Sequence, residues 1–87
     1  METGIYRHYK GQEYLVIGKA ALEESLAEAV IYQALYGEYT LWIRELAIFK
    51  EHLDLPEYPY SGPRFSFRGK WTPEDATKHP KAITPFI

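Results

Sequence analysis

Segments with the composition and spacing of β-strands recur along most of the chain. Residues 4–9 and 64–68 alternate aromatic with polar side chains, whereas residues 13–19 and 39–44 are rich in aromatic and β-branched residues. Alternation at period two is typical of a strand that turns one side to a core and the other to solvent. The chain is therefore predicted to be mainly β, with four or five short strands.

Glycine-containing turns join these segments into hairpins. The first hairpin is expected to turn at residues 10–12, where Gly11 would take a positive φ, and the second spans residues 28–44 around Gly37. Residues 46–51 lack the alternation and predict a short helical turn. A small sheet can shield its edges by curling. We therefore expect a small SH3-like β-barrel with one or two short helical turns.

Residues 20–35 allow a second interpretation. Residues 20–29 have high helix propensity, and large aliphatic side chains recur there at a spacing of four. The strand formers that follow favour a polar loop or a single helical turn over residues 20–27 and then a strand. The preferred fold is mainly β, and the alternative is an α+β fold with a helix at about residues 20–35.

Apolar burial must hold this chain together. A chain of 87 residues forms one small domain, and without cysteine it has neither disulfides nor thiolate metal sites. Eight Tyr, four Phe and two Trp supply the surface to be buried, at about 150–250 Å² each. The aromatic side chains are therefore expected to provide much of the core.

All six prolines lie at or after residue 56, which divides the chain into two parts. We assign residues 1–69 to a single small β domain with a turn-rich connector at residues 56–63. Residues 70–87 are expected to form an extended C-terminal arm. The apolar residues at the end of the arm leave three outcomes open: docking on its own domain, packing on a second copy in a homo-oligomer, or disorder.

Several motifs that follow one another in order resemble a known family. They are Gly-Ile-Tyr-Arg-His-Tyr-Lys-Gly at residues 4–11, Tyr-Leu-Val-Ile-Gly at 14–18, Val-Ile-Tyr-Gln-Ala-Leu-Tyr-Gly at 30–37, Leu-Trp-Ile-Arg at 41–44 and Phe-Lys-Glu at 49–51. Over roughly residues 4–68 the chain is similar to a bacterial family of small proteins called the domain of unknown function number 1653. The resemblance implies a small, mainly β domain and favours strands over residues 28–44, but it implies no activity. Glu45 stands where the family tends to have proline.

The charge balance gives no support to strong nucleic-acid binding. The net charge is −2, and residues 1–55 carry five basic and nine acidic side chains. The first residues lack the pattern of a secretory signal, and no apolar run is long enough to span a bilayer. We expect a soluble cytoplasmic protein without membrane contact.

The histidine, serine and glycine patterns predict no catalytic centre. The three histidines lack metal-ligand spacing, and no serine lies in a Gly-x-Ser-x-Gly elbow. The glycines are too dispersed to form a phosphate-binding loop. We therefore expect a protein that is not an enzyme, with no catalytic residues, no metal site and no cofactor.

Aromatic and basic residues interleave on two of the predicted strands, and they define a candidate binding site. Side chains two apart on a strand share a face, so Trp42 and Arg44 share one side, while Leu41 and Ile43 take the opposite side and are expected to face the core. The candidate ligand-binding residues are Tyr6, Arg7, His8, Lys10, Trp42 and Arg44.

Two uses of these aromatic residues compete. The rings can fill a core that has few aliphatic residues, or they can form an exposed surface that stacks a base or clamps a peptide. The first functional hypothesis is a non-enzymatic binding module for a protein, peptide or small polar ligand. The alternative is a domain that binds single-stranded RNA, which rests on analogy with other small barrels. Complete burial of Trp42 and Arg44 would remove the site.

Overall fold

The computed structural model describes residues 1–56 and 60–85, and within them the chain is mainly β. The strands and helices follow one another as β1 (Gly4–His8), β2 (Glu13–Ala21), β3 (Glu28–Ala34), β4 (Leu41–Glu45), α1 (Leu46–Phe49), β5 (His52–Leu55), β6 (Tyr60–Pro63), β7 (Phe65–Gly69) and α2 (Pro73–Lys78). The prediction of a mainly β fold with short helical turns is confirmed. The α+β alternative is wrong, because residues 22–27 form a loop between two strands.

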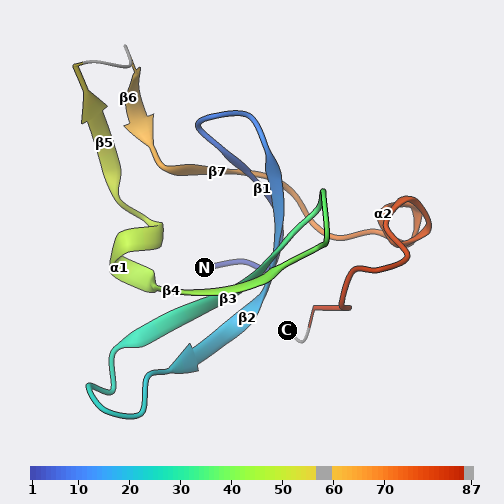
Figure 1. Cartoon of the computed structure of the whole chain (residues 1–87), viewed down its shortest axis with the longest axis horizontal. Helices are drawn as coiled ribbons and strands as arrows, with labels where there is room; N and C mark the ends of the chain where they lie inside the picture. Colours follow the sequence, from blue (N-terminus) through green and yellow to red (C-terminus); the bar gives the residue numbers. More distant parts are fainter. Residues whose placement is uncertain (57–59, 86–87) are drawn as a thin grey trace.

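Five antiparallel strands form the main sheet in the order β4-β3-β2-β1-β7, and β5 pairs separately with β6. The strand pairing does not close the sheet into the expected SH3-like barrel, because β4 and β7 remain its two edges in the described part of the chain. After β4 the chain turns into α1, so β5 does not continue the sheet. Figure 1 shows α1 and the β5–β6 hairpin on one side of the main sheet and α2 on the other.

Both predicted hairpins are present. The β1–β2 turn contains Gly11 at φ +107°, and its amide donates to the His8 carbonyl oxygen at 2.8 Å. The β2–β3 pair changes register between Val16 and Gly18, which leaves an extra residue in β2. Leu15, Val16 and Ile17 are all buried, and they alternate between the two sides of the sheet as successive residues of a strand do, so both sides of β2 are covered.

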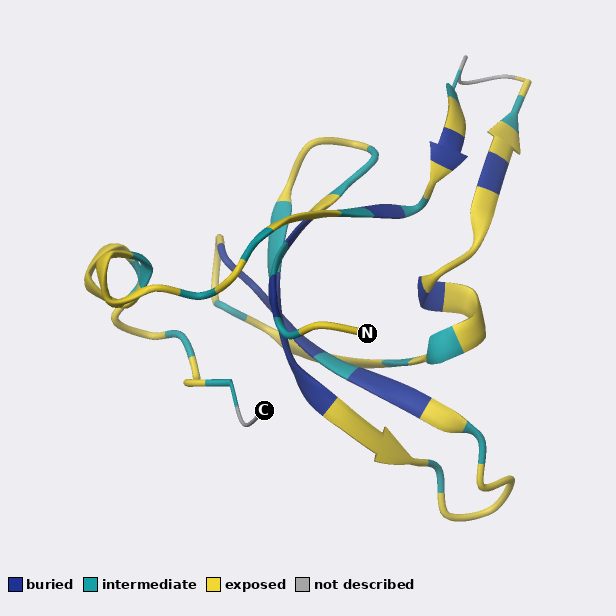
Figure 2. Cartoon of the chain, turned by 180° about the vertical axis from the view of Figure 1, so that it is seen from behind, coloured by how far each residue is buried: buried dark blue, intermediate teal, exposed yellow. Residues whose placement is uncertain are grey.

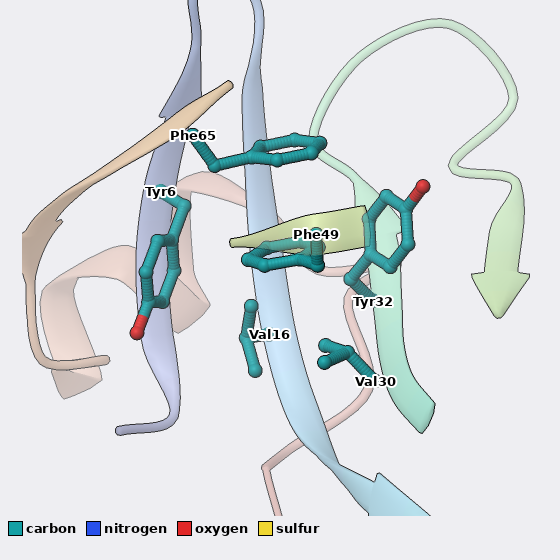
Figure 3. Close-up of a cluster of buried hydrophobic side chains, with 6 residues drawn as sticks. All are labelled: Tyr6, Val16, Val30, Tyr32, Phe49 and Phe65. Carbon is teal, nitrogen blue, oxygen red and sulfur yellow. The ribbon is translucent and has the colours of Figure 1, made fainter. Parts of the chain in front are cut away.

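One side of the sheet, here called the aromatic face, carries the buried cluster of Tyr6, Val16, Val30, Tyr32, Phe49 and Phe65. Figure 3 shows the Phe49 and Phe65 rings lying parallel, with the rings of Tyr6 and Tyr32 on either side. The stacked centroids are 4.1 Å apart, and Phe49 also meets Tyr6 and Tyr32 edge-on at 5.6 and 5.3 Å. Helix α1 therefore closes this face by inserting one phenylalanine.

The opposite side, here called the aliphatic face, carries Leu15, Ile17 and Leu35, with Ile5, Ile31, Tyr39, Trp71 and Ala82 packed against them. Trp71 and Ala82 belong to the C-terminal segment, which therefore lies on the domain in this structure. Gln33 fixes it: its Oε1 accepts from the Ile83 amide at 2.8 Å, and its Nε2 donates to the carbonyl oxygens of Tyr39 and Lys81 at 3.0 and 3.4 Å.

The C-terminal arm is not extended throughout, contrary to the prediction, because helix α2 forms within it over Pro73–Lys78. Thr72 caps the helix, since its hydroxyl accepts from the Asp75 amide at 3.2 Å and the Asp75 carboxylate accepts from the Thr72 amide at 2.9 Å. The predicted connector at 56–63 also contains structure, because β6 begins at Tyr60. Residues 57–59 of that connector, and Phe86 and Ile87 of the arm, lie outside the described residues.

Candidate functional site

A cavity of about 160 Å³ opens at one end of the aromatic face. Five strands position its lining: β1 contributes His8, β2 Tyr14, β3 Tyr32, β4 Trp42 and Arg44, and β7 Phe65. The register explains the grouping, because Trp42 lies opposite Tyr32 and Phe65 lies opposite His8. Facing residues on neighbouring strands project to the same side of a sheet.

Three of the six predicted site residues line this cavity: His8, Trp42 and Arg44. Tyr6 does not, because its ring is buried in the core and its hydroxyl donates to the Glu2 carbonyl oxygen at 2.7 Å. Arg7 is exposed next to it in β1, on the other face of the sheet. Lys10 is exposed in the β1–β2 turn with its ammonium 5.9 Å from the centroid of the Tyr9 ring.

Three further rings, which are not among the predicted site residues, also line the cavity: Tyr14, Tyr32 and Phe65. Tyr14 meets Tyr32 and Phe65 edge-on, each at 5.6 Å. The sequence pattern that could have indicated two of these rings is the period-two alternation of β2 and β7, which places Tyr14 on the same side as Val16 and Phe65 on the same side as Phe67. The pairing of β1 with β7, which joins distant segments, was needed to bring these rings together.

Trp42 and Arg44 are not buried in the core. Trp42 is 49% exposed, and Arg44 is half-buried. In the described ranges no side chain forms a hydrogen bond or an ion pair with the Arg44 guanidinium. The prediction that the other side of β4 faces the core is wrong for Leu41 and Ile43, which are 49% and 62% exposed. As Figure 2 shows, β4 carries no buried residue, since it is an edge strand.

His8 provides a neutral polar group at the rim. Burial lowers the pKa of its imidazole, and the positive charges of Arg64, Lys10 and Arg44 lower it further. Its Nδ1 accepts from the Lys10 amide at 3.2 Å, so the neutral ring carries its proton on Nε2. The ring packs edge-on against Phe65 at 5.0 Å, which fixes its orientation.

Tyr14 is held as a protonated phenol. Burial raises the pKa of its hydroxyl well above the usual range, and the hydrogen bond with the Tyr36 hydroxyl, at 2.6 Å, raises it further. Tyr14 therefore contributes a neutral ring wall, and Arg44 is the side chain of the lining with a fixed charge. The cavity combines a guanidinium, a half-exposed indole and rigid aromatic walls.

The described residues do not assemble a metal site: no group of three or more His, Cys, Asp or Glu side chains could hold an ion. Within the described part of the chain, Ser61 Oγ and His52 Nε2 lie 3.5 Å apart on the exposed strands β5 and β6. No acidic side chain among residues 1–56 and 60–85 hydrogen-bonds this histidine, so the contact lacks the orienting group of a nucleophilic relay. In those same ranges, no helix has the length and apolarity needed to cross a membrane.

Comparison with known proteins places the chain in a family. The model of the family described as "Protein of unknown function (DUF1653)" matches residues 4–67. The chain belongs to this family. A crystal structure of a DUF1653 protein from Bordetella bronchiseptica is similar to it, with a TM-score of 0.71 and 36% identity over 84% of this chain and 94% of the other. No curated protein matches the chain.

Membership in DUF1653 confirms the resemblance seen in the sequence. The matched residues run from β1 into β7, so they include every residue that lines the cavity. The segment after β7 that covers the aliphatic face lies beyond the matched residues.

Proposed function

We propose that this DUF1653 protein is a cytoplasmic, non-enzymatic binding module whose cavity recognises a planar, negatively charged group of a peptide or small polar ligand. The observation that carries the proposal is the half-buried Arg44 guanidinium, which has no partner in the described part of the chain and stands beside the half-exposed Trp42 indole. An arginine that pairs within its own domain would have little left to offer a ligand.

The chemistry of the two side chains sets the ligand class. A guanidinium presents a planar fork of donors that matches a carboxylate or a phosphate. An indole offers a flat apolar surface against which a ring or another planar group can stack. A planar group with an attached carboxylate satisfies both at once.

The size of the cavity limits how much of a ligand can enter. Its volume of about 160 Å³ is below the range of about 300–1,000 Å³ that is typical of sites for drug-sized molecules. The cavity therefore accommodates one side chain or one terminal group, and the rest of the ligand lies on the surface.

The rigidity of the walls favours binding. His8, Tyr14, Tyr32 and Phe65 are fixed by mutual ring contacts at centroid distances of 5.0 to 6.3 Å. A preformed pocket avoids the entropy cost of ordering its walls when the ligand arrives.

The test is a titration of the full chain with benzoate, with acetate and with inorganic phosphate, followed by the indole N–H signals in ¹⁵N-labelled protein. We expect benzoate to shift the Trp42 signal more than acetate does, since only benzoate adds a ring. Arg44→Gln is expected to abolish the shift. Arg68→Gln removes an exposed arginine from β7, and it is expected to bind as the native chain does. A Trp42 signal that does not move with any probe, or that moves equally in the Arg44→Gln protein, would contradict the proposal.

Single-stranded RNA is the second candidate ligand, favoured by the combination of the exposed Trp42 ring and Arg44. The net charge of −2 opposes it. Filter binding to an oligouridine at low and at moderate salt distinguishes the two candidates. Binding that weakens with salt and disappears in Arg44→Gln would support RNA.

A further inference from the structure

The outer edge of β4 is a second unassigned surface, and it adjoins the cavity because Trp42 and Arg44 of the same strand line that cavity. Strand β4 is the last strand of the main sheet, and among residues 1–56 and 60–85 no strand pairs with its outer side. Three consecutive large side chains are exposed along it: Leu41, Trp42 and Ile43, at 49%, 49% and 62%. An exposed apolar edge of this kind is a template for pairing with another strand.

The register with β3 determines which backbone groups this edge offers. The Ala34 amide donates to the Thr40 carbonyl oxygen at 2.9 Å, just before β4 begins. Paired and outward-facing residues alternate along an antiparallel strand, so Trp42 and Arg44 bond toward β3. The amides and carbonyls of Leu41, Ile43 and Glu45 therefore face outward.

The two edges of the sheet differ in their protection against pairing. Strand β7 follows Pro63, ends at Gly69 and carries Arg68, and its pairing with β1 shifts register between Ile5 and Tyr6. Strand β4 carries one basic residue, Arg44, but it has no proline and no irregularity in its register with β3. Proline, basic residues and bulges are the features by which edge strands avoid association, and β4 lacks most of them.

We propose that β4 pairs antiparallel with β4 of a second copy of this chain, about a two-fold axis at Ile43. This register uses all the outward groups, because Ile43 pairs with its counterpart and Leu41 pairs with Glu45 of the other copy. It also sets Trp42 opposite Arg44 of the other copy on the aromatic face, where the guanidinium can lie against the indole. The strand is thus complementary to itself, as a two-fold interface requires.

The proposal does not rest on the ligand suggested above, because the backbone edge of β4 carries it. The pairing does place Trp42 and Arg44, which also line the cavity, at the interface. In the dimer the two main sheets form one continuous sheet, and the cavities open on the same side of it. One short strand from each copy buries less than the roughly 1,600 Å² of a standard interface. We therefore expect a dimer that dissociates on dilution.

The absence of cysteine from the chain allows a direct test. In the proposed register the Cα atoms of the two Ile43 residues lie about 5.5 Å apart, within the range of about 4.4–6.8 Å that a disulfide spans. Under mild oxidation the Ile43→Cys protein is expected to form a covalent dimer. Leu26→Cys is the control, because residue 26 lies in the β2–β3 loop and is more exposed, at 76%. Equal cross-linking of the two variants would overturn the proposal.

A second test uses the native cysteine-free chain in sedimentation equilibrium. The average mass is expected to rise with concentration toward that of a dimer. Ile43→Thr keeps the outward amide and is expected to self-associate, whereas Ile43→Pro removes that amide and is expected to remain monomeric at the same concentrations. Circular dichroism checks that both variants are folded. A native chain that stays monomeric at every concentration, or a folded Ile43→Pro variant that dimerises normally, would overturn the proposal.

Discussion

The two faces of the main sheet are closed in different ways. The aromatic face is covered by α1, which follows β4 directly, and the Phe49 ring of α1 stacks on the Phe65 ring of β7 within a cluster of aromatic side chains. The aliphatic face is covered from a distant part of the chain: the Ile83 amide bonds to Gln33 across 50 positions of sequence. One face is closed by aromatic packing, and the other is fixed by a buried amide.

This difference explains where a binding site can arise. On the aromatic face the cover ends at Phe65, and the remaining rings form the walls of an open cavity beside Arg44. On the aliphatic face Gln33 directs its amide at its own C-terminal segment, so the buried polar side chain there is already satisfied. The half-buried guanidinium without a partner in the described part of the chain, that of Arg44, therefore lies on the aromatic face.

The largest expected effect is on the aromatic packing. Phe49 is 1% exposed and touches three other rings. Phe49→Ala is expected to lower the free energy of unfolding by about 3–5 kcal/mol, the range for removal of a buried phenylalanine. The measurement is urea unfolding followed by circular dichroism.

Ile48→Ala is the matched control, because Ile48 precedes Phe49 in α1 but is 43% exposed. Its cost is expected to stay below about 1 kcal/mol. Similar losses in the two variants would show that α1 contributes through its backbone path and not through the Phe49 ring.

The next effect is on the amide that fixes the C-terminal segment. Gln33→Leu removes three hydrogen bonds and leaves backbone groups of Tyr39, Lys81 and Ile83 without their partner. We expect a loss of about 1–3 kcal/mol and faster proteolysis within residues 78–85. The near-ultraviolet circular dichroism of the aromatic face is expected to be retained. Gln12→Leu, at an exposed turn position, is the control. Protection of the segment that is unchanged in Gln33→Leu would mean that Trp71 and Ala82 suffice to hold it.

Local features of the fold could be predicted from the sequence, because they depend on neighbouring residues. The turn at Gly11, the hairpin over residues 28–44 and the helical turn after Glu45 all follow from alternation and turn residues. The expected barrel is not confirmed, because the strand pairing leaves β4 and β7 as edges, and nothing in a local pattern states which strand pairs with β4. The bulge after Val16 was also not predicted, because it appears only in the register with β3.

The candidate site was predicted only in part for the same reason. Alternation correctly placed Trp42 and Arg44 on one side of β4 and His8 on one side of β1. It could not distinguish His8 from Tyr6, which is on the same side but under Phe49 and Phe67. The contributions of Tyr32 and Phe65 depend on pairings between strands that are distant in sequence.

The smallest expected effect concerns the charge state of His8 at the open end of the aromatic face. Its pKa is lowered in the folded protein, first by burial and then by Arg64, Lys10 and Arg44. The unfolded chain, with a histidine pKa of about 6.5, therefore binds more protons than the folded one below that pH. Stability is full above about pH 6.5 and falls as the pH drops from there toward the lowered pKa of the folded state.

His8→Asn removes this dependence, so the melting temperature of the variant is expected to fall less than that of the native chain between about pH 7 and pH 5. The contribution of His8 to the change in unfolding free energy between these pH values should stay below about 1 kcal/mol, because the imidazole is partly open to solvent and its neighbouring charges are screened. Added salt should reduce the contribution of the three cations to the pKa of His8 and leave that of burial. The slope of the melting temperature against pH is therefore expected to become smaller in the native chain without reaching zero. Identical slopes in the two proteins would mean that His8 is as well solvated when folded as when unfolded, and that the cavity is more open to water than its ring contacts indicate.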